Sequence, residues 1–281
     1  MDVFLYGLTL ALIYGLTAVG FALIFGTCRI FDLAFGSYYL VGAYSFFGLA
    51  PVVGNGAALF LSLLISIAVA LLIHRFVLFP LRKFPIRVLV ASAGLALAIQ
   101  QGIILVFGST FRSIPYLVEG TTRVAGVIIE NQRFLAGGVA IVALILLWLF
   151  LTKTKLGLGI RALEQHPEAA ELIGIEPRTS QLIVASIGAL FAALGSTLSL
   201  SLFVLTPLAW LDALLLAFVA VVVGGLGSTW GAFAGVFIIA YAETVVGFFV
   251  PKGGFLRVAI YLGIMVIVLL ARPWGFFGQK E

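Results

Sequence analysis

Long apolar runs recur along the whole chain, and they constrain the fold more than any other feature of the sequence. A helix needs about 20 apolar residues to cross the ~30 Å hydrocarbon core of a bilayer, and such runs follow one another here with short polar interruptions. Of the 281 residues, 63% are hydrophobic and 10% are charged, whereas soluble domains average roughly 45–50% apolar and 25% charged residues. The sequence therefore predicts an all-α, polytopic membrane protein.

Nine apolar spans are expected, and two of them are short for a full crossing. The spans at 34–50 and 211–226 predict tilted, broken or half-crossing helices, so we expect eight to nine transmembrane helices. The other segments are too short for a separate soluble domain, and residues 1–281 are expected to form a single transmembrane domain. The full set of expected spans is 3–26, 34–50, 56–79, 88–108, 133–151, 180–204, 211–226, 230–250 and 256–271.

The distribution of basic residues between the loops predicts the orientation. Cytoplasmic loops of membrane proteins carry an excess of Lys and Arg. With the N-terminus outside, eleven of the 16 Lys and Arg residues lie on the cytoplasmic side and five on the other side. The sequence thus predicts an outer N-terminus and a cytoplasmic C-terminus, and the net charge of +5 requires no nucleic-acid partner. The longest outer stretch, from about Ser109 to Gln132, is expected to form a small hairpin or an interfacial helix.

The side chains that carry chemistry in other proteins are scarce here. Cys28 is the single cysteine, and without Cys or His neighbours at ligand spacing it predicts packing rather than a disulfide or a metal site. His74, beside Arg75, is expected at the membrane interface. The sequence contains no G-x-x-x-x-G-K-[ST] loop to hold nucleotide phosphates. We therefore expect no catalytic residue, no metal and no cofactor bound by this chain.

One polar segment, residues 153–181, interrupts the apolar pattern and is expected to be a cytoplasmic loop. Within it, Pro167 suits the first position of a helix because its missing N–H would be unpaired there. Glu168 opposes the positive end of the helix dipole, and Gly174 supplies a stop. These signals predict a helix of about two turns from Pro167 to Ile173. An isolated helix this short is marginal in water, so it is either an ordinary surface helix or a docking element.

The same segment resembles a motif of ABC importer permeases, the EAA loop that docks into the ATP-hydrolysing subunit. Glu168, Ala169 and Ala170 are followed at the family's spacing by Gly174. More closely, the segment is similar to permeases of the branched-chain amino acid importer family, of the H type. The positions that match that family are Thr154, Gly157, Arg161, Ala162, Ala170, Gly174 and Ile175.

Two further regions resemble this family, so the resemblance covers essentially the whole chain. They are the N-terminal GLTLALIYGLTAVGFALIFG and the glycine-rich VVVGGLGSTWGAFAGVFIIAYAE at 221–243. One stretch departs from the family, which usually has an Asn-Phe-Ala-His-Gly-like sequence after the first span. This chain has Asp32, Leu33, Ala34, Phe35 and Gly36 there, and the change leaves the identity of the cargo open.

The resemblance implies that transport energy comes from other subunits. The implied complex contains a second, homologous permease chain, two ABC ATPase subunits that bind ATP and Mg²⁺, and a periplasmic or extracellular substrate-binding protein. It lies in a bacterial-type inner membrane and contacts lipid but no nucleic acid. Motion of the ATPases would reach the bundle through the polar loop, where the expected coupling residues are Arg161, Glu164, Pro167, Glu168, Ala169, Ala170 and Gly174.

Polar residues and clustered glycines inside the spans are the candidates for the translocation path. An ionised side chain at the centre of a membrane helix costs about 2.5–3.5 kcal/mol on insertion scales, so it should face protein or water. Clustered glycines either break a helix beside a wet cavity or allow close packing of helices. The path candidates are Asp32, Gln100, Gln101, Asp212, Gly224, Gly225, Gly227 and Glu243.

The implied cargo is a branched-chain or other hydrophobic amino acid, and other cargoes remain open. Urea, short amides and small aromatic acids are alternatives, because related permeases share the same loop and glycine patterns. A rival of another class is an ion-coupled secondary transporter. Such proteins usually carry paired intramembrane charges or an inverted repeat, and this sequence has few intramembrane charges.

Overall fold

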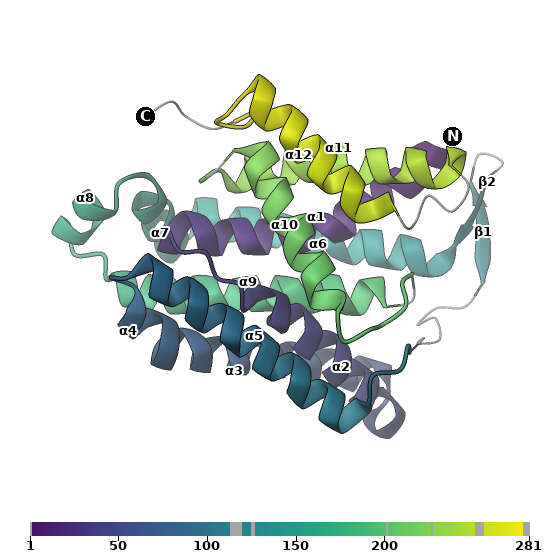
Figure 1. Ribbon diagram of the computed structural model, residues 1–281, viewed down its shortest axis with the longest axis horizontal. Coiled ribbons are helices and arrows are strands. Elements are labelled where there is room, and N and C mark those ends of the chain that lie inside the picture. The colour runs from purple at the N-terminus through teal and green to yellow at the C-terminus, as the bar shows by residue number, and fades with distance from the viewer. Residues whose placement is uncertain are drawn as a thin grey trace.

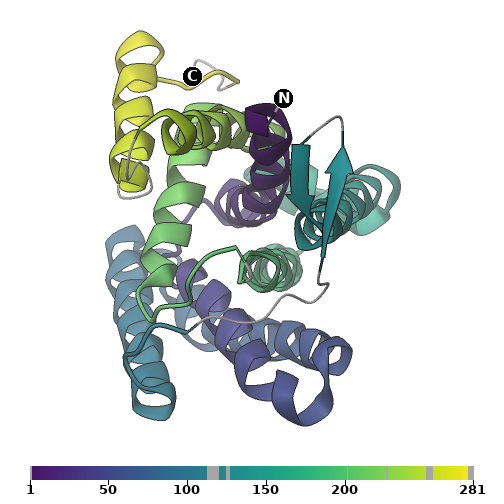
Figure 2. The same cartoon turned by 90° about the vertical axis from the view of Figure 1, so that its right-hand side faces the viewer.

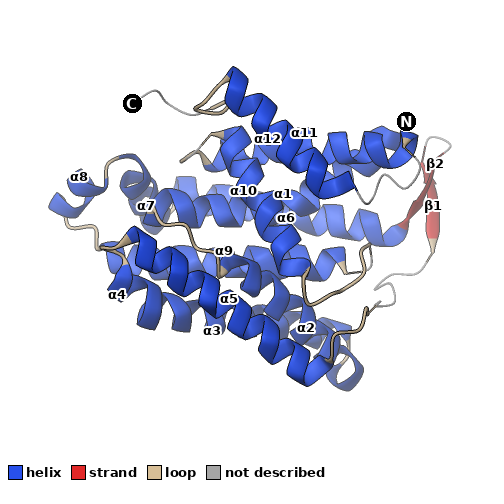
Figure 3. Ribbon diagram, viewed as in Figure 1, coloured by secondary structure: helices blue, strands red, loops and turns tan. Residues whose placement is uncertain are grey.

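The chain forms a bundle of helices with one small β-hairpin (Figures 1 and 3). The computed structural model describes residues 2–112, 120–124, 127–200, 202–225, 227–250 and 256–277. The helices are α1 (Asp2–Cys28), α2 (Phe35–Val53), α3 (Asn55–Ile73), the π-helix η1 (His74–Leu78), α4 (Phe79–Leu81), α5 (Pro85–Phe107), α6 (Asn131–Lys153), α7 (Lys155–Gln165), α8 (Pro167–Leu172), α9 (Pro177–Ser199), α10 (Ala209–Gly224), α11 (Thr229–Phe249) and α12 (Arg257–Ala271).

Every apolar span expected from the sequence coincides with a helix. Within the described ranges, six helices are long and apolar enough to cross a membrane. They are α1, the continuous rod formed by α3, η1 and α4, and α5, α6, α9 and α11. The helices α10 and α12 are apolar but shorter, in line with the expectation of a short span at 211–226. The structure is therefore that of a polytopic membrane protein.

The helix α1 is the centre of the bundle (Figure 2). Every residue from Thr9 to Ile24 is buried, as expected for a helix that is apolar all the way round. Its glycines allow neighbouring helices to approach closely, which replaces the missing hydrophobic drive between helices in lipid. A Cβ on Gly20 would lie 3.1 Å from the carbonyl oxygen of Gly188 in α9. The ring of Phe233 from α11 covers Gly15 in the same way.

The two ends of the bundle carry different elements (Figure 1). The N-terminus and the hairpin lie at one end, and α8 and the C-terminus lie at the other. In the hairpin, β1 (Thr121–Val124) pairs with β2 (Val127–Glu130) in antiparallel register, from Thr121 opposite Glu130 to Val124 opposite Val127. Of the two alternatives for the outer stretch, the hairpin is therefore confirmed in its described part.

The expectation that His74 lies at the membrane interface is wrong. His74 begins the π-helix η1 and is fully buried, with Nε2 3.1 Å from Oδ2 of Asp32. Asp32 is also fully buried and accepts hydrogen bonds from the Tyr38 hydroxyl at 3.0 Å and the Ala34 N–H at 2.9 Å. A polar ring can be buried where it has such a partner. The partner lies 42 positions away in the sequence, so local patterns did not indicate it.

The C-terminal segment after α12 folds back onto the end of α10. The N–H groups of Phe276 and Phe277 donate to the carbonyl oxygens of Val223 and Gly224 at 3.0 and 2.9 Å. The last carbonyls of a helix have no partner within the helix, so these two bonds satisfy groups that would otherwise be unpaired. The tail thereby joins α12 to α10 at the end of the bundle that carries α8.

Candidate functional site

The polar segment 153–181 forms two short helices, α7 and α8, that project from one end of the bundle (Figure 1). The predicted helix from Pro167 is confirmed as α8, one residue shorter than expected. The helix α7 was not expected. It begins where the Thr154 hydroxyl accepts a hydrogen bond from the Gly157 N–H at 3.0 Å, a typical N-cap. The predicted coupling residues therefore lie on two consecutive helices and the turn that follows them.

The helix α8 is held at its base and open at its tip. Ala170 is buried, and its carbonyl oxygen accepts a hydrogen bond from the Ile175 N–H at 3.1 Å. Gly174 follows with a φ of +88°, a conformation that favours glycine. The side chains at the tip point away from the chain, with Leu172 88% and Ile173 75% exposed. Two large apolar side chains are thus exposed side by side at the end of a short helix.

Glu164 connects this element to the bundle. Its Oε1 accepts hydrogen bonds from the hydroxyls of Thr27, at the end of α1, and Thr229, at the start of α11, at 3.4 and 3.5 Å. Burial raises the pKa of this carboxyl from 4.5 to about 7, while the two threonine hydroxyls and the charge of Arg161 oppose that rise. Of the predicted coupling residues, Glu164 is thus the one whose side chain reaches into the bundle.

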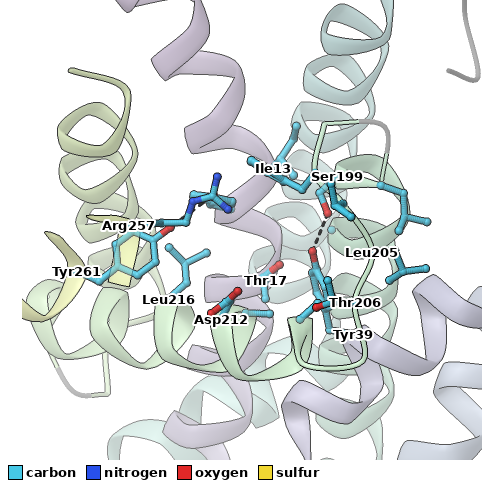
Figure 4. A pocket seen from close by; sticks show the side chains of 17 residues that line it. Ile13, Thr17, Tyr39, Ser199, Leu205, Thr206, Asp212, Leu216, Arg257 and Tyr261 are labelled. Atoms are coloured by element: carbon cyan, nitrogen blue, oxygen red, sulfur yellow. Dashed lines mark hydrogen bonds between the residues drawn. The ribbon is translucent and has the colours of Figure 1, made fainter. Parts of the chain in front are cut away.

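A cavity of about 130 Å³ lies inside the bundle (Figure 4). Its walls come from α1, α2, α9, α10 and α12 and from the segment between α9 and α10. The apolar part of the lining includes Ile13, Leu205, Ala213 and Leu216, and the polar part includes Tyr14, Thr17, Tyr39, Ser199, Thr206, Asp212, Arg257 and Tyr261.

Charged side chains gather on one side of this cavity. Arg257, the first residue of α12, has its Nε 2.6 Å from Oε1 of Glu243, in the geometry of an ion pair rather than of a hydrogen bond. Glu243 also accepts hydrogen bonds from the hydroxyls of Tyr261 at 2.6 Å and Tyr14 at 3.3 Å. Asp212 lines the same cavity from the first turn of α10. On the opposite side, the hydroxyls of Tyr39 and Ser199 are 2.7 Å apart (Figure 4).

The other polar path candidates lie away from the cavity. The side-chain oxygen of Gln100 accepts a hydrogen bond from the Trp210 indole N–H at 2.6 Å. Gln101 is exposed on the outer face of α5. Asp32 belongs to the buried cluster with His74 and Tyr38. Of the predicted charged and amide residues, the structure brings only Asp212 into the lining. Glu243 is not part of the lining but pairs with the lining residue Arg257.

Comparison with known proteins places the chain in a family. Residues 3–269 match the family described as branched-chain amino acid transport system, permease component. The chain belongs to this family. It is 28% identical to the high-affinity branched-chain amino acid transport system permease protein BraD of Pseudomonas aeruginosa, over 98% of this chain and 94% of BraD. It is 27% identical to LivH of Escherichia coli K12 with the same coverage, and 29% identical to a probable LivH of Methanocaldococcus jannaschii, over 94% and 88%.

A solved structure has the same fold. The permease superposes on a chain of PsaBC from Streptococcus pneumoniae, determined in complex with a Fab, with a TM-score of 0.54 and 14% identity. The match covers 100% of the permease and 93% of that chain. At this identity the likeness supports the arrangement of helices and nothing about the ligand.

The glycine-rich stretch of the permease serves helix packing and a tight turn. Gly224, at the end of α10, lies against Gly231, and a Cβ on Gly235 would lie 2.5 Å from the carbonyl oxygen of Ala220. Gly225 and Gly227 have φ values of +112° and +85° in the turn between α10 and α11. The clustered glycines were expected either to break a helix beside a cavity or to allow close packing, and close packing applies to Gly224. Gly225 and Gly227, in the turn, do not line the cavity.

The residue that sequence reasoning missed is Arg257. The sequence places it at the start of the last span, and it is one of the five Lys and Arg residues assigned to the outer side. A charged residue in the first turn of an apolar helix, together with an acidic residue inside the preceding helix, was the available signal. The hydroxyls of Tyr14, Thr17 and Tyr39 carried no signal, because polar groups of this kind are common in membrane helices.

Proposed function

We propose that the permease is the membrane-spanning subunit of an ATP-driven importer that moves branched-chain amino acids into the cell. The observation that carries this proposal is the exposed apolar tip of α8, Leu172 and Ile173, at the end of an element that is joined to α1 and α11 through Glu164. Membership of the branched-chain amino acid permease family supports the cargo. The chain contains no phosphate-binding loop of the Walker type, so hydrolysis belongs to partner subunits.

The partner at α8 is proposed to be an ABC ATPase, with ATP and Mg²⁺ bound by that subunit. Burying a Leu or Ile side chain contributes about 1.5–3 kcal/mol, which gives the tip of α8 a reason to dock. Glu168 and Glu171 are exposed beside it and would fix the register of the contact. Ala169, exposed and small, allows a socket to approach α8 closely. Two such ATPases are expected, one for each permease chain.

Glu164 is proposed to transmit the movement of this element. It reaches the end of α1 and the start of α11, and both helices continue to the cavity region: α1 supplies Ile13 and Tyr14, and α11 supplies Glu243. A push on α8 that tilts α7 would therefore act on α1, which lines the cavity, and on α11, whose Glu243 pairs with the lining residue Arg257.

A second permease chain is the proposed neighbour of α5. This helix presents Gly94, Ala98 and Gly102 on its outer face, and a Cβ on either glycine would meet no described atom within 4 Å. Small residues at this spacing let membrane helices approach closely. Gln101 lies on the same face, and a polar side chain is costly when it faces lipid. A homologous chain packed here would cover both features.

The proposed complex lies in the cytoplasmic membrane, which this chain crosses eight or nine times. The excess of basic residues at the α8 end of the bundle supports a cytoplasmic location for that end. The cavity then lies nearer the outer end, since its lining includes the ends of α9 and the first turns of α10 and α12. A substrate-binding protein on the outside would deliver the amino acid there.

The test is to change the tip of α8 in the assembled importer. The double variant Leu172→Glu, Ile173→Glu should weaken association with the cognate ATPase at least ~tenfold, because two apolar contacts are replaced by charges. Association is measured by copurification from membranes, and transport is measured as leucine uptake into proteoliposomes. The matched control is Val52→Glu, the same kind of change at an exposed residue of α2. Equal ATPase binding and uptake in the α8 variant and the control would contradict the proposal.

A further inference from the structure

The cavity holds two opposite charges that do not pair with each other. The Arg257 guanidinium faces Glu243 through Nε and lies 4.3 Å from the centre of the Phe203 ring. Asp212 lines the cavity from α10, and within the described ranges it forms no ion pair. In Figure 4 the two side chains come from different helices on the same side of the cavity. A ligand between them meets a cation and an anion at once.

Arg257 retains donors for a ligand. Its contact with Glu243 uses Nε, which leaves the two terminal nitrogens of the guanidinium. These nitrogens suit a carboxylate, which an arginine can hold with two parallel hydrogen bonds. The hydroxyls of Tyr14 and Tyr261 hold Glu243 in place behind the arginine, so the guanidinium is fixed from the side away from the cavity.

Asp212 is the complementary group for a cation. A carboxylate only accepts hydrogen bonds and favours a charged donor. The remaining walls include Ile13, Leu205 and Leu216, which present apolar surface. The volume of about 130 Å³ is near the ~150 Å³ of an apolar cavity that accepts benzene, so it suits a small molecule and excludes a peptide.

We propose that this cavity binds the zwitterionic end of an α-amino acid, with Arg257 on the carboxylate and Asp212 on the ammonium group, and with the side chain against the apolar wall. The assignment rests on the proposed import function for the direction of transport, but the binding chemistry stands on the cavity alone. Charge pairing then makes the permease itself selective, in addition to any binding protein that delivers the cargo.

The pairing of charges separates the possible cargoes. A neutral molecule such as urea or a short amide satisfies neither Arg257 nor Asp212 by charge. A small aromatic acid pairs with Arg257 and places its negative charge near Asp212 with no ammonium group between them. Charges taken out of water need their partners, so the zwitterion is the ligand that this cavity favours over both.

The experiment measures binding of radiolabelled leucine to the permease–ATPase complex in nanodiscs without the binding protein. Leucine should compete at least ~tenfold better than 4-methylpentanoate, which lacks the ammonium group, and 3-methylbutylamine, which lacks the carboxylate. In Asp212→Asn, leucine should weaken at least ~tenfold while 4-methylpentanoate is unchanged or binds better. In the double variant Arg257→Gln, Glu243→Gln, which keeps the buried pair neutral, leucine should weaken to a similar extent and 3-methylbutylamine should not.

Glu130→Gln is the matched control, because it neutralises a carboxylate in a partly exposed ion pair with Arg133 outside the cavity. It should leave all three affinities unchanged. The assignment is overturned if a complex that imports leucine shows no leucine binding at millimolar concentration. It is also overturned if the two analogues match leucine, or if Asp212→Asn weakens leucine and 4-methylpentanoate equally. Failure of the importer proposal is distinct, since it appears as loss of ATPase association or of uptake in the wild-type complex.

Discussion

The α7–α8 element and the cavity are built in opposite ways. The element uses consecutive residues, from Thr154 to Gly174, and its tip is exposed. The cavity is lined by residues from Ile13 to Tyr261 that come from five helices. The α7–α8 element can be recognised from consecutive residues of the sequence. The cavity forms only when distant segments of the chain pack together. The two regions should therefore respond differently to substitution, in stability and in function.

The largest effect is expected at Glu243. Glu243→Leu leaves Arg257 and the Tyr14 and Tyr261 hydroxyls without their acceptor. Removing one partner of a fully buried ion pair costs about 3–5 kcal/mol, and the partly exposed Arg257 side chain places the expected loss below that range. Denaturation of the purified permease complex, followed by helix content, measures this loss. If Glu243→Leu proves as stable as wild type, the cavity does not depend on the ion pair between Glu243 and Arg257 for its stability.

The matched surface change for this prediction is Arg133→Gln. Arg133 is paired with Glu130 at a spacing of three residues, and both side chains are partly exposed. Surface ion pairs contribute about 0–1 kcal/mol, so Arg133→Gln should leave the free energy of unfolding nearly unchanged.

A smaller effect on stability, with a larger effect on coupling, is expected at Gly174. Its φ of +88° costs a residue with a Cβ about 1–2 kcal/mol, and this cost falls on the turn after α8. In Gly174→Ala, the ratio of leucine uptake to ATP hydrolysis should fall while the complex still assembles. Both rates are measured in proteoliposomes.

The control for Gly174→Ala is Gly138→Ala, an exposed helical glycine of α6 whose added Cβ would meet no described atom within 4 Å. It should leave the ratio unchanged, because alanine is favoured in a helix. A normal ratio in Gly174→Ala would place coupling somewhere other than α8.

The smallest effect is expected at Glu164, whose carboxyl is only partly shielded from water. Its pKa rises on folding from 4.5 to about 7, so the folded state binds the proton more tightly than the unfolded state. The resulting stabilisation is complete below pH 4.5 and is lost as pH rises through about 7. Over this range the melting temperature of wild type should fall relative to that of Glu164→Gln, which carries no titrating group.

The hydroxyl of Thr229 allows this prediction to be sharpened. It donates to Glu164 and favours the ionised carboxylate, so Thr229→Val should move the pH window upward. A melting curve for Thr229→Val with the wild-type pH dependence would show that Glu164 does not reach α11 as described.

The bundle was predictable because its signal is repeated along the chain. Each apolar run coincides with a helix, and Pro167 with Gly174 located α8. The helix α7 was missed, although Gly157, Ile160 and Leu163 are buried at intervals of three residues, because two glycines in KLGLGIRALEQ weaken the helical pattern. The cluster of Asp32 and His74 was not predicted, since it joins the loop between α1 and α2 to the π-helix η1, 42 positions away.

The cavity was predictable only in part, for a related reason. Asp212 stood out as a charge inside an apolar run, and it lines the cavity. Arg257 stood at the edge of a run, where a basic residue is usual in membrane proteins. Its role depends on Glu243 and Phe203, and the sequence does not state which of several helices pack together. The coupling and path roles of these residues stay predictions.

The folded-back C-terminal segment has a mechanical consequence. Asp212 lies in the first turn of α10, and Arg257 is the first residue of α12. The backbone hydrogen bonds of Phe276 and Phe277 connect the C-terminal ends of these two helices. These two hydrogen bonds couple α10 to the segment that follows α12. A tilt of α10 should therefore move α12, and Arg257 with it. A purification tag fused directly after Trp274 would remove both hydrogen bonds. It would thereby disturb Asp212 and Arg257, although they lie at the other ends of α10 and α12.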